Sequence, residues 1–558
     1  MKELSIGDYI IFLIYFVIVA SYGLWVYRRK KIVGVSSSKD YFLAEGSLTW
    51  WAIGASLIAS NISAEQMVAM SGNGFTMGLA ISTYEWMAAI TLVIVAVFFI
   101  PVYLKNKIFT MPQFLHQRYN STVAMIMAIF WLLLYVIVNL TSILYLGAIA
   151  VHGISGINFS LCLGLLAVFA VIITLGGMKV IGFTDVIQVF FLILGGLVTT
   201  YIAVNLVAEH FGQQGIASGL SIMYNKYHDH FKMILPRSNP SYGDLPGLTV
   251  LLGGMWIVNL NYWGCNQYIT QRALGADLKT ARGGILFAAF LKLLMPVIVV
   301  LPGIAAYVLF KEQVFDHASA ANIAENHDNA YPVLLNLLPN GIKGLAFAAL
   351  TAAVVASLAG KANSIATIFT LDIYKKKINP AATEKNLVNV GKITVVVAMI
   401  LGVVISPFLG IDKKGGFQFI QEYTGFVSPG ILAMFLLGFF WKKASSNAAL
   451  FATVGGFVFS VFFKFLPKFS NLESLSSIGF SFKNTESGLW EIPFLDRMGI
   501  TFVICMISMV IISLIDAARG KKMKGLEVDT SMFKTTNGFA VGALIIIGIL
   551  AALYTVFY

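Results

Sequence analysis

The residues with the clearest potential for chemistry are ionisable and amide side chains inside long apolar segments. Glu85 lies early in one such segment, and Lys292 lies well inside another. A charge at membrane depth costs about 2.5–3.5 kcal/mol to insert, so it needs a partner or a function. Gln66, Asn259 and Gln421 add hydrogen-bond donors and acceptors at comparable depth. These five side chains are the first candidates for a binding site.

Two interpretations of Glu85 and Lys292 stay open at the level of sequence. They form a buried ion pair that only fixes helix packing, or they converge with the amides on a ligand that carries several hydroxyls. The second interpretation favours a neutral polyol, because the charges of the set cancel. Five further side chains are expected to enclose such a ligand, with Tyr262 and Trp263 on one face and Met70, Tyr135 and Phe417 on the other.

The segments that carry these residues are long enough to cross a membrane. The chain has 558 residues, of which 58% are apolar and 11% charged, and its mean hydropathy is +0.82. A soluble domain has about a quarter of its residues charged, and a spanning helix needs about 20 apolar residues. We expect an all-α membrane protein with fourteen spans, which start near residues 6, 48, 78, 121, 157, 181, 246, 284, 344, 389, 417, 444, 495 and 537.

Basic residues gather in the connections on one side of these spans. Examples are the runs Arg28–Lys31, Lys375–Lys377 and Arg519–Lys524. Because Lys and Arg are enriched in cytoplasmic connections, this pattern predicts a cell-membrane protein with both termini outside. The net charge of +12 is therefore a topology signal, and no nucleic-acid partner is expected.

Two spans have polar middles that are typical of interrupted helices. The second span contains the polar run Asn61–Gln66, and the seventh contains Gly253-Gly254 followed by several amides. Irregular backbone at membrane depth lines a cavity or is buried in protein. Such helices in corresponding positions of two five-helix halves predict an inverted-repeat transporter. The expected parts of this single transporter domain are a first helix and inner loop (1–47), a first repeat (48–207), an outer loop (208–245), a second repeat (246–443) and three C-terminal helices (444–558).

Six motifs, in matching order along the chain, closely resemble the sodium/solute symporter family. They are Asn61–Gln66, Tyr84–Met87, Asn139–Ser142, Thr184–Gln188, Asn266–Tyr268 and Gln421–Gly425. The resemblance runs from about Asp8 to the C-terminus. It implies fourteen helices, the leucine-transporter type of 5+5 inverted repeat, and transport by alternating access.

The resemblance also implies roles for individual residues. The family's sugar ligands correspond to Gln66, Glu85, Asn259, Lys292 and Gln421, its stacking inner-gate tyrosine to Tyr262, and its outer hydrophobic gate to Met70, Tyr135 and Phe417. Its sodium ligands correspond to the carbonyl groups of Ala59, Ile62 and Ala353 and the hydroxyl of Ser357. At Ala88 a sugar-transporting member has a sugar-contacting serine, so this chain lacks one hydroxyl contact.

The expected sodium site departs from the family at Ala356, where a second hydroxyl is usual. Lys361 follows Ser357 by four residues and so lies on the same helix face. Three interpretations of Lys361 stay open: it pairs with Asp185, it reaches a water-filled inner vestibule, or its ammonium stands in for sodium. Asn61, Asp185 and Lys361 are therefore candidate coupling residues.

The expected activity is sodium-coupled symport of a neutral sugar, a hexose such as galactose or glucose. The alternatives are symport of inositol, sialic acid or another polyol, sodium-independent or proton-linked sugar transport, and a sensor or channel that binds sugar without concentrating it. No nucleophile–base pair, phosphate loop or metal-ligand spacing indicates an enzyme. The expected partners are the sugar, the co-transported sodium ion and the lipid bilayer, and no oligomeric state is predicted.

Overall fold

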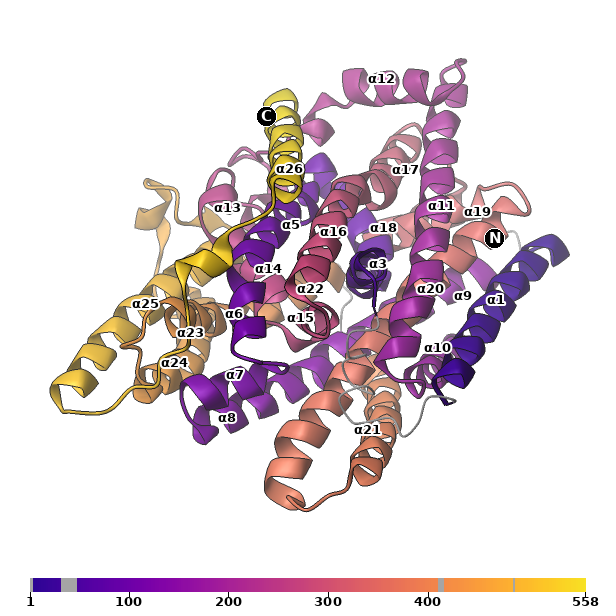
Figure 1. The fold of residues 1–558 in the computed structure, drawn as a ribbon. Helices are drawn as coiled ribbons and strands as arrows, with labels where there is room; N and C mark the ends of the chain where they lie inside the picture. Colours follow the sequence, from indigo (N-terminus) through magenta and orange to yellow (C-terminus); the bar gives the residue numbers. More distant parts are fainter. Residues whose placement is uncertain (1–3, 32–47, 410–415, 485–486) are drawn as a thin grey trace.

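The computed structural model describes residues 4–31, 48–409, 416–484 and 487–558, and their regular structure is almost entirely helical (Figure 1). The part of the predicted first segment at 32–47 lies outside the described residues. A short antiparallel hairpin of β1 (Phe482–Lys483) and β2 (Trp490–Glu491) lies in the connection before α25 (Phe494–Ala518).

The first half of the chain contains helices that correspond to the predicted first helix, first repeat and outer loop. They are α1 (Ile6–Lys31), α3 (Trp50–Asn61), α4 (Ser71–Met77), α5 (Thr83–Ile94), α6 (Ile100–Lys105), α7 (Met111–Arg118), α8 (Ser121–Leu133), α9 (Thr141–Ser155), α10 (Phe159–Thr174), α11 (Met178–His210) and α12 (Ile216–Lys226).

The second half contains helices of 4 to 26 residues. They are α13 (Thr249–Leu252), α14 (Gly254–Gly264), α15 (Gln267–Leu274), α16 (Leu278–Val299), α17 (Leu301–Lys311), α18 (His317–Glu325), α19 (Ala330–Asn336), α20 (Ile342–Thr367), α21 (Glu384–Ile405), α22 (Gly416–Gly425), α23 (Ser428–Phe440), α24 (Ser446–Phe465), α25 and α26 (Asn537–Val556).

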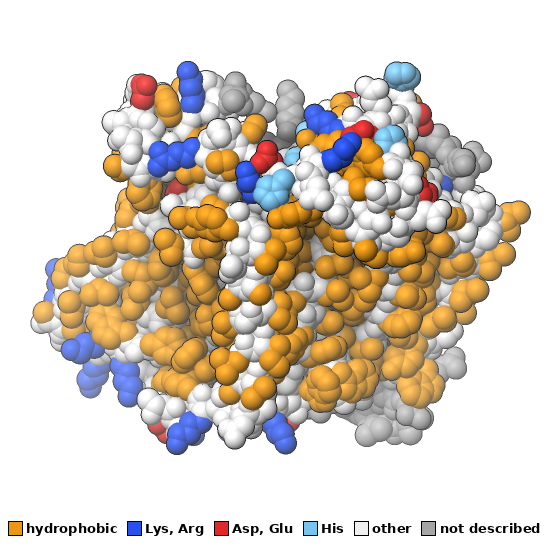
Figure 2. Space-filling model, turned by 90° about the horizontal axis from the view of Figure 1, so that it is seen from above, with side chains coloured by type: hydrophobic (Ala, Val, Ile, Leu, Met, Phe, Trp, Pro, Cys, Tyr) orange, Lys and Arg blue, Asp and Glu red, His pale blue; other side chains and the backbone are white. Residues whose placement is uncertain are grey.

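On the face of the molecule shown in Figure 2, a broad apolar band lies between two edges that carry charged side chains. On α10 the exposed apolar side chains recur every three or four residues, at Leu161, Leu165, Val168 and Ile172. This spacing places them on one helix face. An exposed apolar face of this extent is stable against lipid and unfavourable against water, so the band marks the bilayer.

Ten helices among the described residues are long and apolar enough to cross a membrane, or eleven if the bent pair α22 and α23 is one span. The two helices of that pair meet at 50°. Three predicted spans fall outside this set for local reasons. α3 and α14 end at interruptions after 12 and 11 residues, and α10 has 16 residues. The chain is thus a multi-pass helical membrane protein.

The centre of the bundle is α20, which is buried along almost its whole length. Its sequence is rich in alanine, and small residues allow neighbouring helices to approach closely. At Gly195 of α11, an added Cβ would lie 2.6 Å from the Ala349 Cβ of α20. α20 also packs on α1, α3, α9 and α10. Polar residues on α20 therefore lie in the core of the protein.

One buried arginine joins the first repeat to the end of α23. The Arg118 guanidinium donates to the carbonyl groups of Gly438, Trp441 and Ala444 at 2.7, 2.8 and 3.0 Å. These carbonyls lie at or beyond the last turn of α23, where helical partners are lacking.

We expect Arg118→Ala to destabilise the fold, because it leaves three carbonyl groups without a buried donor. The expected loss is about 2–4 kcal/mol, measured as a lower thermal unfolding midpoint in detergent. Arg519→Ala, at an exposed residue after α25, is the control and should leave the midpoint unchanged. Equal midpoints for the two variants would contradict this role of Arg118.

Candidate substrate and cation sites

The first interruption lies between α3 and the π-helical turn η1 (Glu65–Met70). α3 ends at Asn61, and Ile62 is extended, with φ −78° and ψ 112°. Carbonyl groups at the end of a helix lack intrahelical partners. Because lipid offers no hydrogen bonds, such groups must be satisfied by protein, by water or by a cation.

Three carbonyls at this interruption surround one hydroxyl of α20. Ser357 Oγ lies 3.3 Å from the Ala59 oxygen and 3.1 Å from the oxygens of Ser60 and Ile62. A hydroxyl has one hydrogen to donate, so it satisfies one of the three at a time. Three of the predicted sodium ligands therefore meet at one point, and Ala353 lies one turn before Ser357 on α20. This set of neutral oxygens suits a hard cation.

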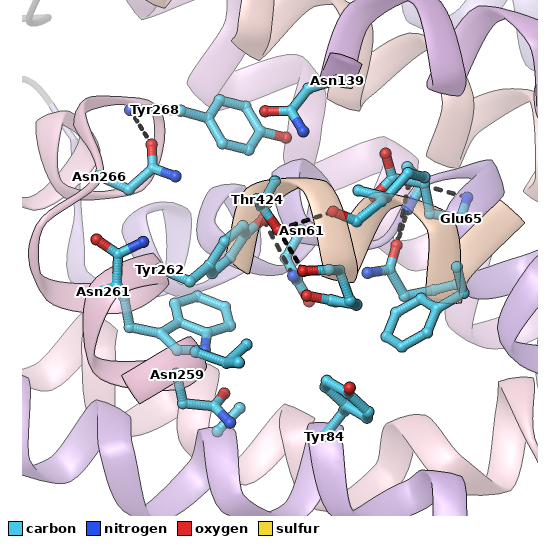
Figure 3. A pocket seen from close by; sticks show the side chains of 18 of the residues that line it. Asn61, Glu65, Tyr84, Asn139, Asn259, Asn261, Tyr262, Asn266, Tyr268 and Thr424 are labelled. Carbon is cyan, nitrogen blue, oxygen red and sulfur yellow. Dashed lines mark hydrogen bonds between the residues drawn. The ribbon is translucent and has the colours of Figure 1, made fainter. Parts of the chain in front are cut away.

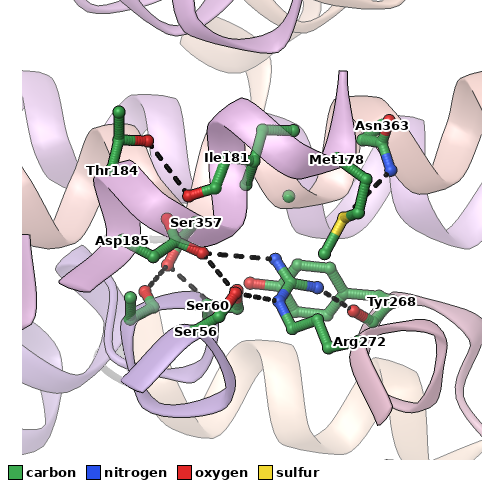
Figure 4. Close-up of polar contacts among 12 residues, drawn as sticks. Ser56, Ser60, Met178, Ile181, Thr184, Asp185, Tyr268, Arg272, Ser357 and Asn363 are labelled. Atoms are coloured by element: carbon green, nitrogen blue, oxygen red, sulfur yellow. Dashed lines mark hydrogen bonds and ion pairs between the residues drawn. The ribbon is translucent and has the colours of Figure 1, made fainter. Parts of the chain in front are cut away.

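The predicted pairing of Asp185 with Lys361 is wrong. The Asp185 carboxylate accepts the Ser56 hydroxyl at 2.5 Å and lies 4.0 Å from the Arg272 guanidinium (Figure 4). Arg272 Nε also donates to Ser56 Oγ, at 2.9 Å. The reason is that α15 is buried throughout and so brings the Arg272 side chain to Asp185. Lys361 instead donates to Asn139 Oδ1 at 3.1 Å.

The second interruption flanks α14. Gly253, with φ −129° and ψ −107°, separates α13 from α14, and Cys265 ends α14. Asn266 then begins α15, with its side chain accepting the Tyr268 N–H at 3.1 Å. A Cβ at Gly264 would lie 2.7 Å from a ring atom of Phe99, so glycine permits this close packing. Three polar residues of the short α14, Asn259, Asn261 and Tyr262, line one cavity.

A cavity with many polar lining residues, partly open to solvent, lies between the two interruptions (Figure 3). All seven residues predicted to contact substrate line it: Gln66, Glu85, Asn259, Tyr262, Trp263, Lys292 and Gln421. Asn61, Lys361 and Phe417 line it as well. The structure thus brings together residues that are far apart in the sequence.

A chain of hydrogen bonds crosses the cavity wall. The Lys292 ammonium donates to the Glu85 carboxylate and to Asn61 Oδ1. Asn61 Nδ2 in turn donates to the Tyr262 hydroxyl at 3.2 Å. Lys292 Nζ also lies 5.3 Å from the centre of the Trp263 ring, within cation–π range. Asn61, at the end of α3, therefore connects the charged pair to the predicted inner-gate tyrosine.

In two residues predicted to bind the substrate, one end of the side-chain amide forms a hydrogen bond within the protein. Gln66 Oε1 accepts the Ser63 N–H at 3.0 Å, and Asn259 Nδ2 donates to the Met255 carbonyl at 3.1 Å. The opposite ends of these amides are the NH₂ group of Gln66 and the carbonyl oxygen of Asn259. The cavity thus offers an oriented donor and an oriented acceptor, as recognition of a hydroxyl requires.

Of the three residues predicted for the outer gate, only Phe417 lines the cavity, whereas Met70 and Tyr135 are buried away from it. Phe417 packs edge-on against Tyr84, with ring centres 4.9 Å apart. Tyr135 instead donates to Asn266 Oδ1, beside the Lys361 ammonium. The aromatic neighbour of Phe417 in the lining is therefore Tyr84.

Helix α22, which carries Phe417 and Gln421, is held by hydrogen bonds at both ends. Asp328 Oδ2 accepts the Gly416 N–H at 2.8 Å. Burial raises the pKa of Asp328 to about 6, so at pH 7 it accepts this bond as an anion. Near the other end, Glu422 accepts from Arg497 Nη2 at 2.7 Å and from Lys464.

Several lining residues were not singled out from the sequence. Glu65 and Asn139 line the cavity, as do Asn266 and Thr424. Glu65 carried a usable signal, because it is an acid inside the polar middle of a predicted span. Asn266 and Thr424 gave no comparable signal, since an amide or hydroxyl in a helix usually satisfies its own backbone.

The pair of Glu85 and Lys292 makes a prediction about stability. Lys292→Met and Glu85→Gln should each lower the thermal midpoint, because each leaves one buried charge without its partner, at a cost of about 3 kcal/mol. The double variant should recover most of the loss. Lys232→Met, which breaks an exposed pair with Asp229, should change little. A double variant less stable than both single ones would contradict a direct pair.

Comparisons with known proteins agree with this geometry. Residues 41–456 match the model of the sodium:solute symporter family. The sodium/glucose cotransporter of Vibrio parahaemolyticus is 47% identical over 100% of this chain and 99% of its own length. The human sodium/myo-inositol cotransporter 2 is 33% identical over 82% of this chain and 69% of its own length. A solved Na⁺-coupled sialic acid symporter shares the fold, with a TM-score of 0.74, 20% identity and coverage of 92% of this chain and 98% of its own. The chain therefore belongs to the sodium:solute symporter family.

Proposed function

We propose that this protein is a secondary active transporter that carries a neutral hexose-like sugar into the cell together with sodium. The observation that carries the proposal is the junction at Asn61. On one side of this residue the α3 carbonyls meet the hydroxyl of Ser357, and on the other side its amide contacts Lys292 and Tyr262. Asn61 thus lies between carbonyl groups of the proposed cation site and contacts two residues of the proposed polyol site.

The charge of the cavity supports a neutral substrate. Its described lining contains two carboxylates, Glu65 and Glu85, and two ammonium groups, Lys292 and Lys361. An anionic or cationic solute would meet no excess of opposite charge there. A sugar hydroxyl both donates and accepts, and the cavity supplies both kinds of partner. The relatives named for glucose and myo-inositol transport support a polyol in the same way.

Ala88 lines the cavity and offers no hydrogen bond through its side chain. A substrate hydroxyl near Ala88 would therefore have one hydrogen-bond partner fewer than it would have beside a serine. The proposal is therefore a hexose, with the identity of the hexose set in part at Ala88. An inositol, which is also a neutral ring polyol, is the second candidate.

The proposed coupling mechanism depends on Asn61, which lies between the two proposed sites. Sodium at the carbonyls of Ala59 and Ile62 holds the end of α3 against α20, and so fixes Asn61. Asn61 then orients Lys292 toward the sugar and keeps Tyr262 in place below it. Loss of sodium to the cytoplasm frees Tyr262 to move. Because each ligand favours the same conformation, sodium and sugar should tighten each other's binding by the same factor.

The proposed topology places both termini outside. Counting α3, α10 and α14 with the eleven longer spans yields fourteen passes, as expected for a 5+5 core with one helix before it and three after. Basic runs such as Arg519–Lys524 then lie in the cytoplasm.

Sugar accumulation tests the activity directly. Proteoliposomes with an inward sodium gradient should concentrate labelled glucose or galactose, and a choline gradient should not support this. Gln421→Ala should reduce uptake at least tenfold, because it removes a lining amide. Gln418→Ala is the control, since Gln418 is buried on the same helix and does not line the cavity. Accumulation in choline with a proton gradient would favour proton coupling, and no accumulation at all would favour a sensor.

Removal of the Ser357 hydroxyl tests the cation site. In the wild type, sodium should raise the thermal midpoint and tighten sugar binding. Ser357→Ala should weaken the sodium response roughly tenfold, a loss of about 1.4 kcal/mol for one oxygen ligand. Ser364→Ala, two turns along α20 with its hydroxyl bonded to the Gly360 carbonyl, should respond as the wild type does. An unchanged response in Ser357→Ala would place the cation elsewhere.

A further inference from the structure

Lys361 occupies a box of aromatic rings within the cavity. Its side chain is 4% exposed, and its ammonium donates to Asn139 Oδ1 at 3.1 Å. Three tyrosine rings surround the same ammonium, with their centres at 4.0 Å (Tyr268), 5.1 Å (Tyr135) and 6.0 Å (Tyr262). Aromatic faces at these distances attract a cation. The three tyrosine rings thus form a cation-binding environment that is occupied by the ammonium group of Lys361.

The charge that opposes this ammonium belongs to Glu65. Both side chains line the cavity, and their charges attract each other. Glu65 Oε1 also accepts the Ser142 hydroxyl at 3.1 Å. Arg272 is the other charged group that acts on Lys361, and it repels the ammonium while its guanidinium faces Asp185. Glu65 is therefore the acidic group that compensates Lys361.

The position of Glu65 relates this pair to the cation site. It follows Ile62, whose carbonyl belongs to the proposed sodium site, by three residues across the interruption of α3. Lys361 follows Ser357 by one helical turn on α20. A carboxylate at the start of η1 and an ammonium on α20 thus each lie within one helical turn, along the chain, of an oxygen of the proposed sodium site.

We propose that Lys361 is a built-in counter-cation that neutralises Glu65 and thereby keeps the adjoining sodium site weak enough to release its ion. The inference rests on the proposed sodium symport. Without the ammonium, a buried carboxylate would attract sodium from three residues away. With it, the ion is held by neutral oxygens alone and leaves when the inner gate opens.

The expected size follows from Coulomb's law. For charges about 8–10 Å apart at an effective dielectric constant of about 20, removal of one charge changes the affinity of the ion on the order of tenfold. The sign depends on which charge is removed. Loss of the ammonium should raise sodium affinity, and loss of the carboxylate should lower it.

A double-variant cycle on the purified full-length protein tests the proposal, with sodium chloride as the probe and choline chloride as the ionic-strength control. Lys361→Met should bind sodium about tenfold more tightly than the wild type and turn over sugar more slowly, because release is delayed. Glu65→Gln should bind sodium about tenfold more weakly. The double variant should return to within threefold of the wild type.

Two further variants separate charge from packing. Lys361→Arg keeps the charge and should retain wild-type sodium affinity. Lys343→Met removes another buried lysine at the opposite end of α20 and should not alter sodium affinity. If Lys361→Met does not fold, a tenfold loss of sodium affinity in Glu65→Gln together with wild-type affinity in Lys361→Arg still supports the proposal.

The outcomes distinguish this proposal from the proposed function. A shift in the same direction for Lys361→Met and Glu65→Gln, or no shift in either, overturns the role of Lys361 and leaves sodium symport standing. A sodium response that appears only in Lys361→Met overturns symport by the wild type and supports the neutralising role. No response to sodium in any variant overturns both.

Discussion

The interruption of α3 at membrane depth is the constraint on which the rest of the site depends. A helix that stops inside the bilayer exposes carbonyl groups that lipid cannot satisfy. Here the carbonyls of Ala59, Ser60 and Ile62 converge on the single hydroxyl of Ser357, which has one hydrogen for three acceptors. A cation bound at the proposed site would satisfy the remaining carbonyls and stabilise the interrupted helix.

Asn61 extends this constraint to the substrate. It is the last residue of α3, and its amide accepts from Lys292 and donates to Tyr262. A change in the order of the helix end would therefore reach both the charged pair and the Tyr262 ring. For the proposed symport, two discrete arrangements of this one segment would suffice for reciprocal coupling, without any longer pathway through the protein.

Much of the site could be anticipated from residue types. Glu85 and Lys292 were identifiable because charges in apolar spans are costly, and the two interruptions because polar and glycine-rich runs rarely persist inside lipid. Partner choice was less predictable. Asp185 and Lys361 were each expected to need a partner, but the buried helix α15 brings Arg272 to Asp185 and leaves Lys361 to Asn139 and three tyrosines. Phe417 likewise packs against Tyr84, a contact between distant parts of the chain that residue types alone do not reveal.

The sequence by itself determined that the chain is a multi-pass helical membrane protein with two interrupted segments and a balanced set of buried charges. These properties depend on composition and on order along one helix, which are local. Only the tertiary structure decided which buried charges pair, and that Asn61 joins Lys292 to Tyr262 next to the carbonyls that surround Ser357. Such contacts join residues hundreds of positions apart, and their geometry depends on how α3, α14, α15 and α20 pack together.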